Sequence, residues 1–598
     1  MLRDSLLEMT VDVLKSRLKL IATAKKVTRK ADVIEEISRF VLSEKIKDYW
    51  QMLDELDQLA IAEALYYCQG HYYFDRFLAK YNQQPAYFLA TGFGSKPVTS
   101  NSRYMGLFFY NRNIPEDLQS LLKKFVQKPE ATQIITETEL PENYLFDPEN
   151  DPDDYSPVTV SITEVLIRHD LPVVLNLINQ GKITVSDKTG VASSASIRSL
   201  EAVLSGGDYY QPEQQIDIDS FEGGPIRPIR TYAWPLLLQS SGLVKRNGKK
   251  LVLTRKGIKA LTSPFSETIK LIYERWRNKG ILDEYSRINL VKGQKAKGRI
   301  MADPSQRRIE IDLLLSACPV GKWISIDNLL RYIRAGDYDI KICHDYYRLY
   351  LAESGYGTLA YAQNPFEVLT GRYIMVYFFE YLATLGMIDI AYIPPYYARS
   401  DYRDLWGADD IQFLSRYDGL LYFRLNALGE YCLGLNHQYH YEQAETTHLF
   451  EINEQFELIL TRNALPDEQQ VLNLFAKETD NKQWELSELL TLEALEKGQN
   501  TQDFCDFLQQ RHAQKLPVEV MDFFTEQNDK ATAFSDGGRA QLIHSSSRLI
   551  KFIVSEKTTK NLCQQVDSRI VLVVDKKEKE FRKALKKLGY LLPLTHKT

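Results

Sequence analysis

The sequence lacks the motifs of disulfide-bonded and nucleotide-driven proteins. It contains no CxxC pair and no G-x-x-x-x-G-K-[ST] loop, whose amides and lysine would cradle nucleotide phosphates, so no helicase motor is expected. The few cysteines are spread along the chain: Cys68, Cys318, Cys343, Cys432, Cys505 and Cys563. This spacing is typical of reduced structural thiols in a cytosol.

A long uncharged hydrophobic run is also missing. The most apolar long stretch, residues 373–392, is broken by Glu380 and Asp389, whereas a membrane-spanning helix needs about 20 nearly uncharged residues. The first ten residues already carry three charged side chains, so no signal peptide is expected. These features predict a cytoplasmic protein without a membrane span.

The chain has no overall excess of positive charge. Its net charge is −5, so any surface for nucleic acid must be local. Tyrosine, in contrast, is abundant: there are 36, and many stand in pairs such as Tyr66-Tyr67, Tyr72-Tyr73 and Tyr346-Tyr347. The first interpretation of these pairs is the amphipathic edge of a core, and the second is stacking on nucleic-acid bases.

Length and pattern predict an α+β multi-domain protein with a helical N-terminal region, winged-helix-like units and a C-terminal mixed α/β domain. At 598 residues the chain is too long for a single core. The expected segments are a helical hairpin (1–45), a helical domain (46–140), an acidic linker (141–160), a first winged-helix-like region with a basic wing (161–290), a basic linker (291–308), a second winged-helix-like region (309–445) and the α/β domain (446–598).

A basic hairpin is the most informative segment of the chain. Two β-prone runs, residues 243–244 and 251–253, are joined through Asn247-Gly248, a strong hairpin-turn dipeptide. A helix before the hairpin and another after it complete the outline of a winged helix. The predicted DNA contacts of this wing are Lys245, Arg246, Lys249, Lys250, Arg255 and Lys256. A hairpin whose charges are merely solvated remains the alternative.

A second basic turn lies near the N-terminus. Thr10 is expected to cap a helix with Val11, Leu14 and Leu18 on its apolar side, and Val33, Ile34 and Ile37 mark the next helix. The pair resembles the SAP motif, a small DNA-binding module, through Thr10-Val11, Leu14-Lys15, residues 29–32 and residues 34–37, although the usual glycine before the second helix is missing. The resemblance implies DNA contacts from the turn residues Lys25, Lys26, Arg29 and Lys30. A solvated turn on a plain helical hairpin is the alternative.

The second winged-helix-like region has a wing of opposite charge. Helices are predicted at residues 307–316, 326–333 and 374–385, and strands at 321–325, 387–393 and 420–425. The wide wing before the last strand is acidic and aromatic, with Asp401, Asp404, Trp406, Asp409 and Asp410. This composition indicates a protein contact or internal packing rather than phosphate binding.

The order of these pieces resembles bacterial helicase-associated proteins that share the N-terminal domain of XPB-type DNA repair helicases. The matching segments are residues 176–190 and 192–204, residues 321–323 with 326–329, residues 450–460, 484–498, 501–507 and 516–520, and residues 569–574 with 585–590. The resemblance implies an accessory role beside a helicase that acts in trans. It supplies no catalytic residues.

Candidate metal sites are weak. Asp147, Asp151, Asp153 and Asp154 lack the alternating ligands and closing Glu of a calcium loop, so a solvated acidic linker is favoured. A zinc site of Cys432, His437 and His440, with His448 a distant fourth ligand, lacks one of the two close pairs that structural zinc prefers.

Catalytic patterns are equally weak. The adjacent side chains of Cys343, His344 and Asp345 point in different directions, which argues against a triad. A metal-dependent nuclease would need converging acids, but Asp567 and Asp575 stand at opposite ends of a predicted strand. No catalytic residue, metal or cofactor is predicted.

Together these patterns favour a non-enzymatic DNA-binding accessory protein, nucleoid-associated, that works with an XPB-like helicase in DNA repair or processing. Binding to phosphates through lysine and arginine should be steeply salt-dependent and weakly sequence-specific. The strandedness of the DNA is left open. The alternative is an interaction scaffold whose winged helices bind partner proteins and no DNA.

Overall fold

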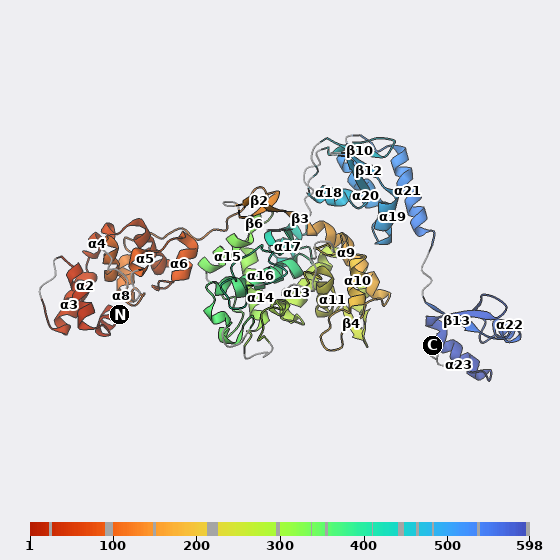
Figure 1. Cartoon of the computed structure of the whole chain (residues 1–598), viewed down its shortest axis with the longest axis horizontal. Coiled ribbons are helices and arrows are strands. Elements are labelled where there is room, and N and C mark those ends of the chain that lie inside the picture. Colours follow the sequence, from red (N-terminus) through yellow and green to blue (C-terminus); the bar gives the residue numbers. More distant parts are fainter. Residues whose placement is uncertain are drawn as a thin grey trace. The chain divides into compact units, whose positions relative to one another are not determined.

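The computed structural model (Figure 1) forms two compact units. It describes residues 1–22, 27–89, 100–147, 151–211, 225–294, 300–336, 338–352, 357–409, 411–440, 448–461, 464, 466–480, 483–512, 514–534 and 539–593. Unit 1 comprises Met1–Leu449, Leu460–Leu474 and Lys497–Gln499, and unit 2 comprises Phe450–Ile459, Phe475–Glu496 and Asn500–Thr598. Helices and several small antiparallel sheets give the predicted α+β multi-domain character.

The N-terminal region is helical, as predicted. Its elements are α1 (Leu2–Leu7), α2 (Val11–Leu20), α3 (Lys30–Val41), α4 (Ile46–Met52), α5 (Glu55–Tyr67), α6 (Phe74–Tyr81), α7 (Ala86–Leu89), a 3-10 helix (Asn101–Leu107) and α8 (Glu116–Leu122). Thr10 caps α2 as expected, because its hydroxyl accepts from the Val13 amide. Val11, however, is exposed rather than part of the apolar side. One hydrophobic cluster extends from Leu2 to Val126 and crosses the expected boundary after residue 45.

The acidic segment 141–160 forms strands instead of an unstructured linker. β1 (Asn143–Asp147) and β2 (Asp151–Pro157) pair as an antiparallel hairpin, and β3 (Thr159–Ser161) pairs with β7 (Ile388–Tyr392) of the central sheet. Main-chain hydrogen bonds therefore order a segment whose composition is unsuited to a core. Ser161, at the end of β3, is already buried.

The first winged-helix-like region has the strand and helix order of that fold. It runs through α9 (Thr163–Asn179), an extended segment at 183–185 that forms isolated β-bridges, α10 (Ser194–Glu201), α11 (Arg230–Ser241), β4 (Val244–Asn247) and β5 (Lys250–Leu253), followed by α12 (Arg255–Ala260) and α13 (Phe265–Lys279). Thr184 pairs with Lys250, so this extended segment lies beside β5.

The second region repeats this order. Its elements are α14 (Pro304–Ser316), β6 (Trp323–Ser325), α15 (Ile326–Ala335), a continuous helix of π and α turns (Glu367–Gly371, then α16, Arg372–Val376, then Tyr377–Leu382), β7 and β8 (Leu420–Leu425). The strands are ordered β3-β7-β8-β6, and α17 (Ala427–Leu433) follows β8. All six elements predicted here from sequence are present.

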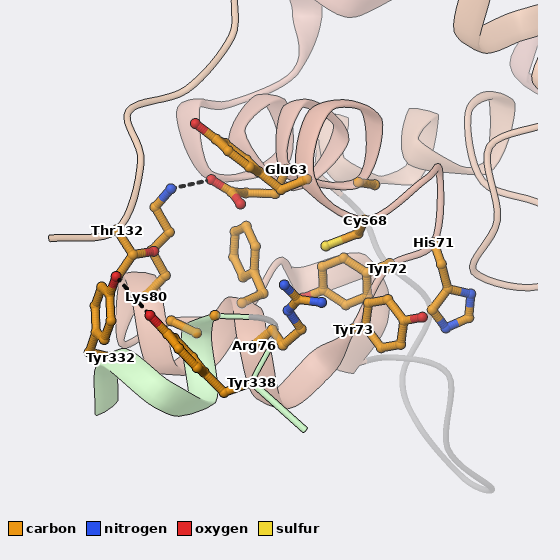
Figure 2. Close-up of a pocket in the computed structure, with 15 residues that line it drawn as sticks. Glu63, Cys68, His71, Tyr72, Tyr73, Arg76, Lys80, Thr132, Tyr332 and Tyr338 are labelled. Carbon is orange, nitrogen blue, oxygen red and sulfur yellow. Dashed lines mark hydrogen bonds and ion pairs between the residues drawn. The ribbon is translucent and has the colours of Figure 1, made fainter. Parts of the chain in front are cut away.

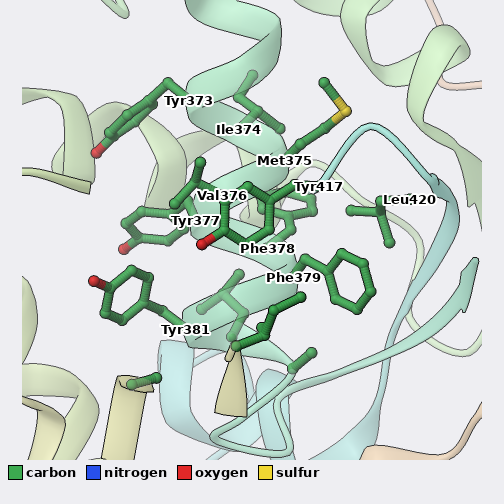
Figure 3. Close-up of a cluster of buried hydrophobic side chains, with 14 of the residues drawn as sticks. Tyr373, Ile374, Met375, Val376, Tyr377, Phe378, Phe379, Tyr381, Tyr417 and Leu420 are labelled. Atoms are coloured by element: carbon green, nitrogen blue, oxygen red, sulfur yellow. The ribbon is translucent and has the colours of Figure 1, made fainter. Parts of the chain in front are cut away.

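The two regions share one core. It extends from Ile167 to Cys432, and the helix at 367–382 lies at its centre (Figure 3). Tyr373, Tyr377 and Tyr381 point from this helix into the core and are fully buried or nearly so. Burial accounts for many of the abundant tyrosines, in line with the first interpretation of their number.

The segment 291–308 is not a simple basic linker. Lys295, Lys297 and Arg299 lie outside the described residues, but Arg307 and Arg308 belong to α14 and are buried. Arg307 pairs with Asp283 at 2.7 Å, and Arg308 pairs with Glu284 at 2.6 Å. These arginines therefore stabilise the core and are unavailable to a phosphate.

Unit 2 is a mixed α/β unit, as predicted. Its first sheet has the order β11-β12-β10-β9, and its second has the order β13-β15-β14. The strands are β9 (Phe450–Ile452), β10 (Glu457–Leu460), β11 (Ala476–Asp480), β12 (Gln483–Leu486), β13 (Ala540–His544), β14 (Gln564–Gln565) and β15 (Ile570–Val574). The helices are α19 (Glu488–Glu496), α20 (Thr501–Arg511), α21 (Val518–Thr532), α22 (Ser547–Ser555) and α23 (Glu578–Lys587), while α18 (Pro466–Leu472) belongs to unit 1.

Two predictions for residues 446–598, a helix at 468–478 and a β-prone run at 541–554, were wrong. The helix predicted at 468–478 ends at Leu472, and β11 begins at Ala476. The β-prone run 541–554 is strand only to His544, because Ser546 caps α22 by accepting from the Leu549 amide.

Within the described residues, no helix has the length and apolarity needed to cross a membrane.

Candidate nucleic-acid interface

The predicted wing is present as the β4–β5 hairpin. Val244 pairs with Leu253 at its base and Asn247 with Lys250 at its tip. The two-residue loop is Gly248-Lys249, one residue later than the dipeptide suggested, and Gly248 has a φ of +58°, which suits glycine. Figure 1 shows the hairpin at the edge of the central body, near α10 and α11.

The wing is buried at its base, and most of its other side chains face solvent. Val244 and Leu251 are buried and anchor the hairpin to the core. The solvent-facing cations are Lys245, Arg246, Lys249, Lys250, Arg255, Lys256 and Lys259, all of them exposed. No ion pair within the described part of the chain involves any of them, so no described carboxylate neutralises their charge. The arrangement is a positive surface on a fixed backbone.

Helix α12 holds three of these cations against the base of the hairpin. Thr254 caps α12 by accepting from the Gly257 amide at 3.2 Å. Gly257 lies so close to the hairpin that a Cβ would meet the Leu243 carbonyl oxygen at 2.2 Å. Only glycine permits this approach, which places Arg255 and Lys256 next to the wing.

Two further lysines join the surface from a segment that the sequence did not connect with it. Lys182 and Lys188 are exposed at either end of the extended segment that pairs with β5. Arg246 Nη1 donates to the Asp187 carbonyl oxygen at 2.6 Å, so the turn beside Lys188 contacts the wing directly. The sequence indicated that residues 182–186 are β-prone and precede a glycine turn. It did not indicate that this stretch pairs with β5, because the two segments are far apart along the chain.

Neither third helix of the winged-helix regions is able to enter a DNA groove. In α11 every residue is buried or half-buried, and Arg230 forms an ion pair with Asp170 inside the core. In the second region residues 368–392 are buried throughout. Reading of base edges by a recognition helix needs an exposed polar face. The exposed cations of the wing are therefore the candidate contact surface in this part of the chain.

The N-terminal turn is only partly described. Lys25 and Lys26 lie outside the described residues, so the structure does not place them. Arg29 is exposed at the start of α3, and Lys30 Nζ donates to the Leu7 carbonyl oxygen at 2.9 Å. Lys30 thus helps hold α1 against α3, and Arg29 presents its charge to solvent.

The acidic second wing packs inward at Asp401, whereas Asp404, Trp406 and Asp409 are exposed. Asp401 pairs with the buried Arg372 at 2.6 Å, and Asp404 accepts from the Gln363 amide at 2.7 Å. The charge of Arg372 lowers the pKa of the Asp401 carboxyl, although burial opposes the effect. Trp406 is 64% exposed, and Asp410 lies outside the described residues. Internal packing, one of the two predicted roles, therefore accounts for Asp401.

The candidate metal and catalytic clusters do not converge. Cys432 is buried, whereas His437, His440 and His448 are exposed. Cys343 is also buried, and burial raises the pKa of its thiol to about 11, which disfavours the thiolate needed by a nucleophile. Among the residues that the structure describes, no group of three or more His, Cys, Asp or Glu side chains is placed to hold a metal ion.

No protein-family model matches this chain, and no curated protein matches it. The resemblance to the helicase-associated proteins therefore remains a prediction from local patterns and their order.

Proposed function

We propose that this protein is a non-enzymatic, nucleoid-associated DNA-binding accessory protein that works with an XPB-like helicase in DNA repair or processing. The observation that carries the proposal is the wing: at least seven exposed cations on a rigid hairpin and its following helix, none of them in an ion pair with a described residue. Lysine and arginine in such an array release counterions when they neutralise phosphates. Because the chain as a whole is negatively charged, we expect DNA to bind locally at this surface, through its phosphate backbone.

The mode of binding follows from the buried third helices. Phosphate contacts from a wing position a protein on DNA but carry little sequence information. We therefore expect weak sequence preference and a steep dependence of affinity on salt. The slope of log K against log salt should be about −0.9 for each phosphate neutralised on duplex DNA.

The test is a charge reversal of the wing. A variant with Lys245→Glu, Arg246→Glu, Lys249→Glu and Lys250→Glu should lose at least tenfold in duplex affinity at low salt and show a shallower salt slope. The matched control reverses two exposed lysines elsewhere, Lys123→Glu and Lys124→Glu, and should keep wild-type binding. Unchanged duplex affinity of the wing variant would show that the wing does not contact DNA.

Unit 2 supplies a surface that supports docking of the partner. α22 and α23 pack on the Val571 and Val573 side of β15, and the described residues place no helix on the other side. Leu542, opposite Leu572 on that other side, is 59% exposed. A strand that is apolar on both sides is typical of sheets covered on both faces. The surrounding residues 539–593 carry 13 Lys and Arg against 5 Asp and Glu, which suits an acidic partner surface.

A protein-only scaffold is the second candidate. The two buried third helices favour it, because neither presents the exposed polar face that reads base edges. Retention of partner binding together with no shift of duplex or single strand at low salt would select the scaffold.

A further inference from the structure

A tyrosine-rich hollow lies in unit 1, between α5, α6 and the end of α15 (Figure 2). Its volume is about 370 Å³. A neighbouring hollow of about 420 Å³ shares Lys80 and Thr132 with it. We call the two hollows together the tyrosine trough. None of the residues of the tyrosine trough belongs to the wing.

Aromatic rings line both sides of the tyrosine trough. Tyr73, 46% exposed, stands on one side with His71 at a ring distance of 4.4 Å. Tyr332 and Tyr338 stand on the other side, 5.8 Å apart (Figure 2). Burial raises the pKa of the Tyr338 phenol above its usual value, so the ring stays neutral at physiological pH. Neutral, partly exposed rings are the surfaces on which unpaired bases stack.

Cations accompany these rings. The Arg76 guanidinium lies 5.5 Å from the centre of the Tyr73 ring, and the Lys128 ammonium lies 5.2 Å from that of Tyr67. Arg331 lines the neighbouring hollow and donates to the Gln133 carbonyl oxygen at 3.2 Å. Lys80 is already paired with Glu63 at 2.5 Å. Arg76 and Arg331 thus line the trough together with the acids Glu63 and Glu130, and Lys128 lies beside it at Tyr67.

The walls are held in place by packing behind them. Tyr72, next to Tyr73, is buried and stacks on Phe88 at 3.7 Å. His71 Nδ1 hydrogen-bonds Asn113 Oδ1 at 2.8 Å, and the Tyr67 hydroxyl donates to the Pro129 carbonyl oxygen at 3.0 Å. A pre-formed aromatic surface loses little conformational entropy when a ligand stacks on it.

We propose that the tyrosine trough binds single-stranded nucleic acid, with an unpaired base stacked on the tyrosine walls and its phosphates beside Arg76 and Arg331. A hollow of about 370 Å³ is at the lower end of ligand-sized pockets and accepts a nucleotide rather than a duplex. This inference rests on the proposed DNA-binding function and adds single strands to the duplex contacts of the wing.

The test compares a fluorescent (dT)12 strand with a blunt duplex at fixed salt, using the full chain. Tyr73→Ala should weaken single-strand affinity about fivefold or more, in keeping with roughly 1–3 kcal/mol for a lost base stack. Tyr73→Trp should keep it, because the ring face is retained. Duplex affinity should stay at the wild-type value in both variants, since the wing is untouched.

Two outcomes would overturn the proposal. One is a Tyr73→Ala variant that binds (dT)12 within twofold of wild type. The other is photo-crosslinking of a 5-iododeoxyuridine strand to wing peptides alone, with no adduct on residues 67–80 or 332–338. Failure of the proposed function looks different: the wing charge reversal would leave duplex binding intact, whatever the trough does. A retained crosslink to Tyr73 or Tyr338 would support the trough even then.

Discussion

Arg372 and Asp418 form a completely buried ion pair, with Arg372 Nε 3.0 Å from Asp418 Oδ1 and both side chains fully excluded from solvent. Arg372 lies on the central helix and Asp418 just before β8, so the pair ties the end of the acidic wing to the core. Burial raises the pKa of the Asp418 carboxyl, and the charge of Arg372 opposes that rise. The same arginine also binds Asp401, which is why this wing does not extend into solvent there.

We expect Asp418→Ala to destabilise unit 1 strongly. Removing one partner of a buried pair costs about 3–5 kcal/mol, and here Asp401 alone would be left to compensate the buried charge of Arg372. The matched control is Asp327→Ala, whose carboxylate is 79% exposed in its pair with Arg399 and should cost less than about 1 kcal/mol. Urea unfolding followed by tryptophan fluorescence measures both. Equal losses of unfolding free energy in the two variants would show that the buried pair contributes no more to stability than the exposed pair.

Gly257→Ala should disturb the wing without touching its charges. The new Cβ would collide with the Leu243 carbonyl oxygen, so the hairpin base or α12 must shift. Such overpacking costs about 1–3 kcal/mol and should lower duplex affinity several-fold. Gly106→Ala is the control, because its Cβ would meet only ordinary contacts of 3.6 Å. Duplex titration and hydrogen exchange of residues 243–253 check the result, and wild-type values in both would contradict it.

Lys182 and Lys188 should take part in DNA binding although they lie outside the basic hairpin. The double variant Lys182→Gln and Lys188→Gln should reduce the salt slope on duplex DNA by up to about two, at roughly 0.9 per phosphate contact. Lys47→Gln with Lys45→Gln, on α4 and just before it, removes as much charge elsewhere and should leave the slope unchanged. Identical slopes for all three proteins would confine the interface to residues 245–259.

Glu164 should make unit 1 less stable as the pH rises. Burial, with Asp389 nearby, raises the pKa of this carboxyl from 4.5 to about 7, while the Tyr439 hydroxyl and Arg168 oppose the shift. The folded state thus holds its proton more tightly than the unfolded state. Stability should fall between about pH 4.5 and pH 7, by at most about 1.4 kcal/mol per pH unit from this group.

The measurement for Glu164 compares thermal midpoints of wild type and Glu164→Gln at pH 5 and pH 8. Glutamine keeps a hydrogen-bond acceptor for Tyr439 but carries no charge. The variant should therefore gain stability relative to wild type at pH 8 and gain little at pH 5. A difference that is the same at both pH values would show that Glu164 does not titrate in this range.

Much of the local structure was determined by the sequence alone. Asn247-Gly248 between two β-prone runs identified the hairpin, and Thr10 identified the start of α2, because turns and caps depend on neighbouring residues. The same holds for the strands β6, β7 and β8, whose apolar runs the structure buries. The exposure of Lys245, Arg246, Lys249 and Lys250 was also correctly expected.

Tertiary structure decided which charges remain available. Arg307 and Arg308 read as basic linker residues in the sequence but are neutralised by Asp283 and Glu284, which precede them by 24 positions each. Tyr73 and Tyr338 line the same hollow from opposite sides, although the first interpretation of the tyrosine pairs was a core edge. Such groupings depend on contacts between distant segments of the chain. A local pattern of residues does not show which distant segment will pack against it.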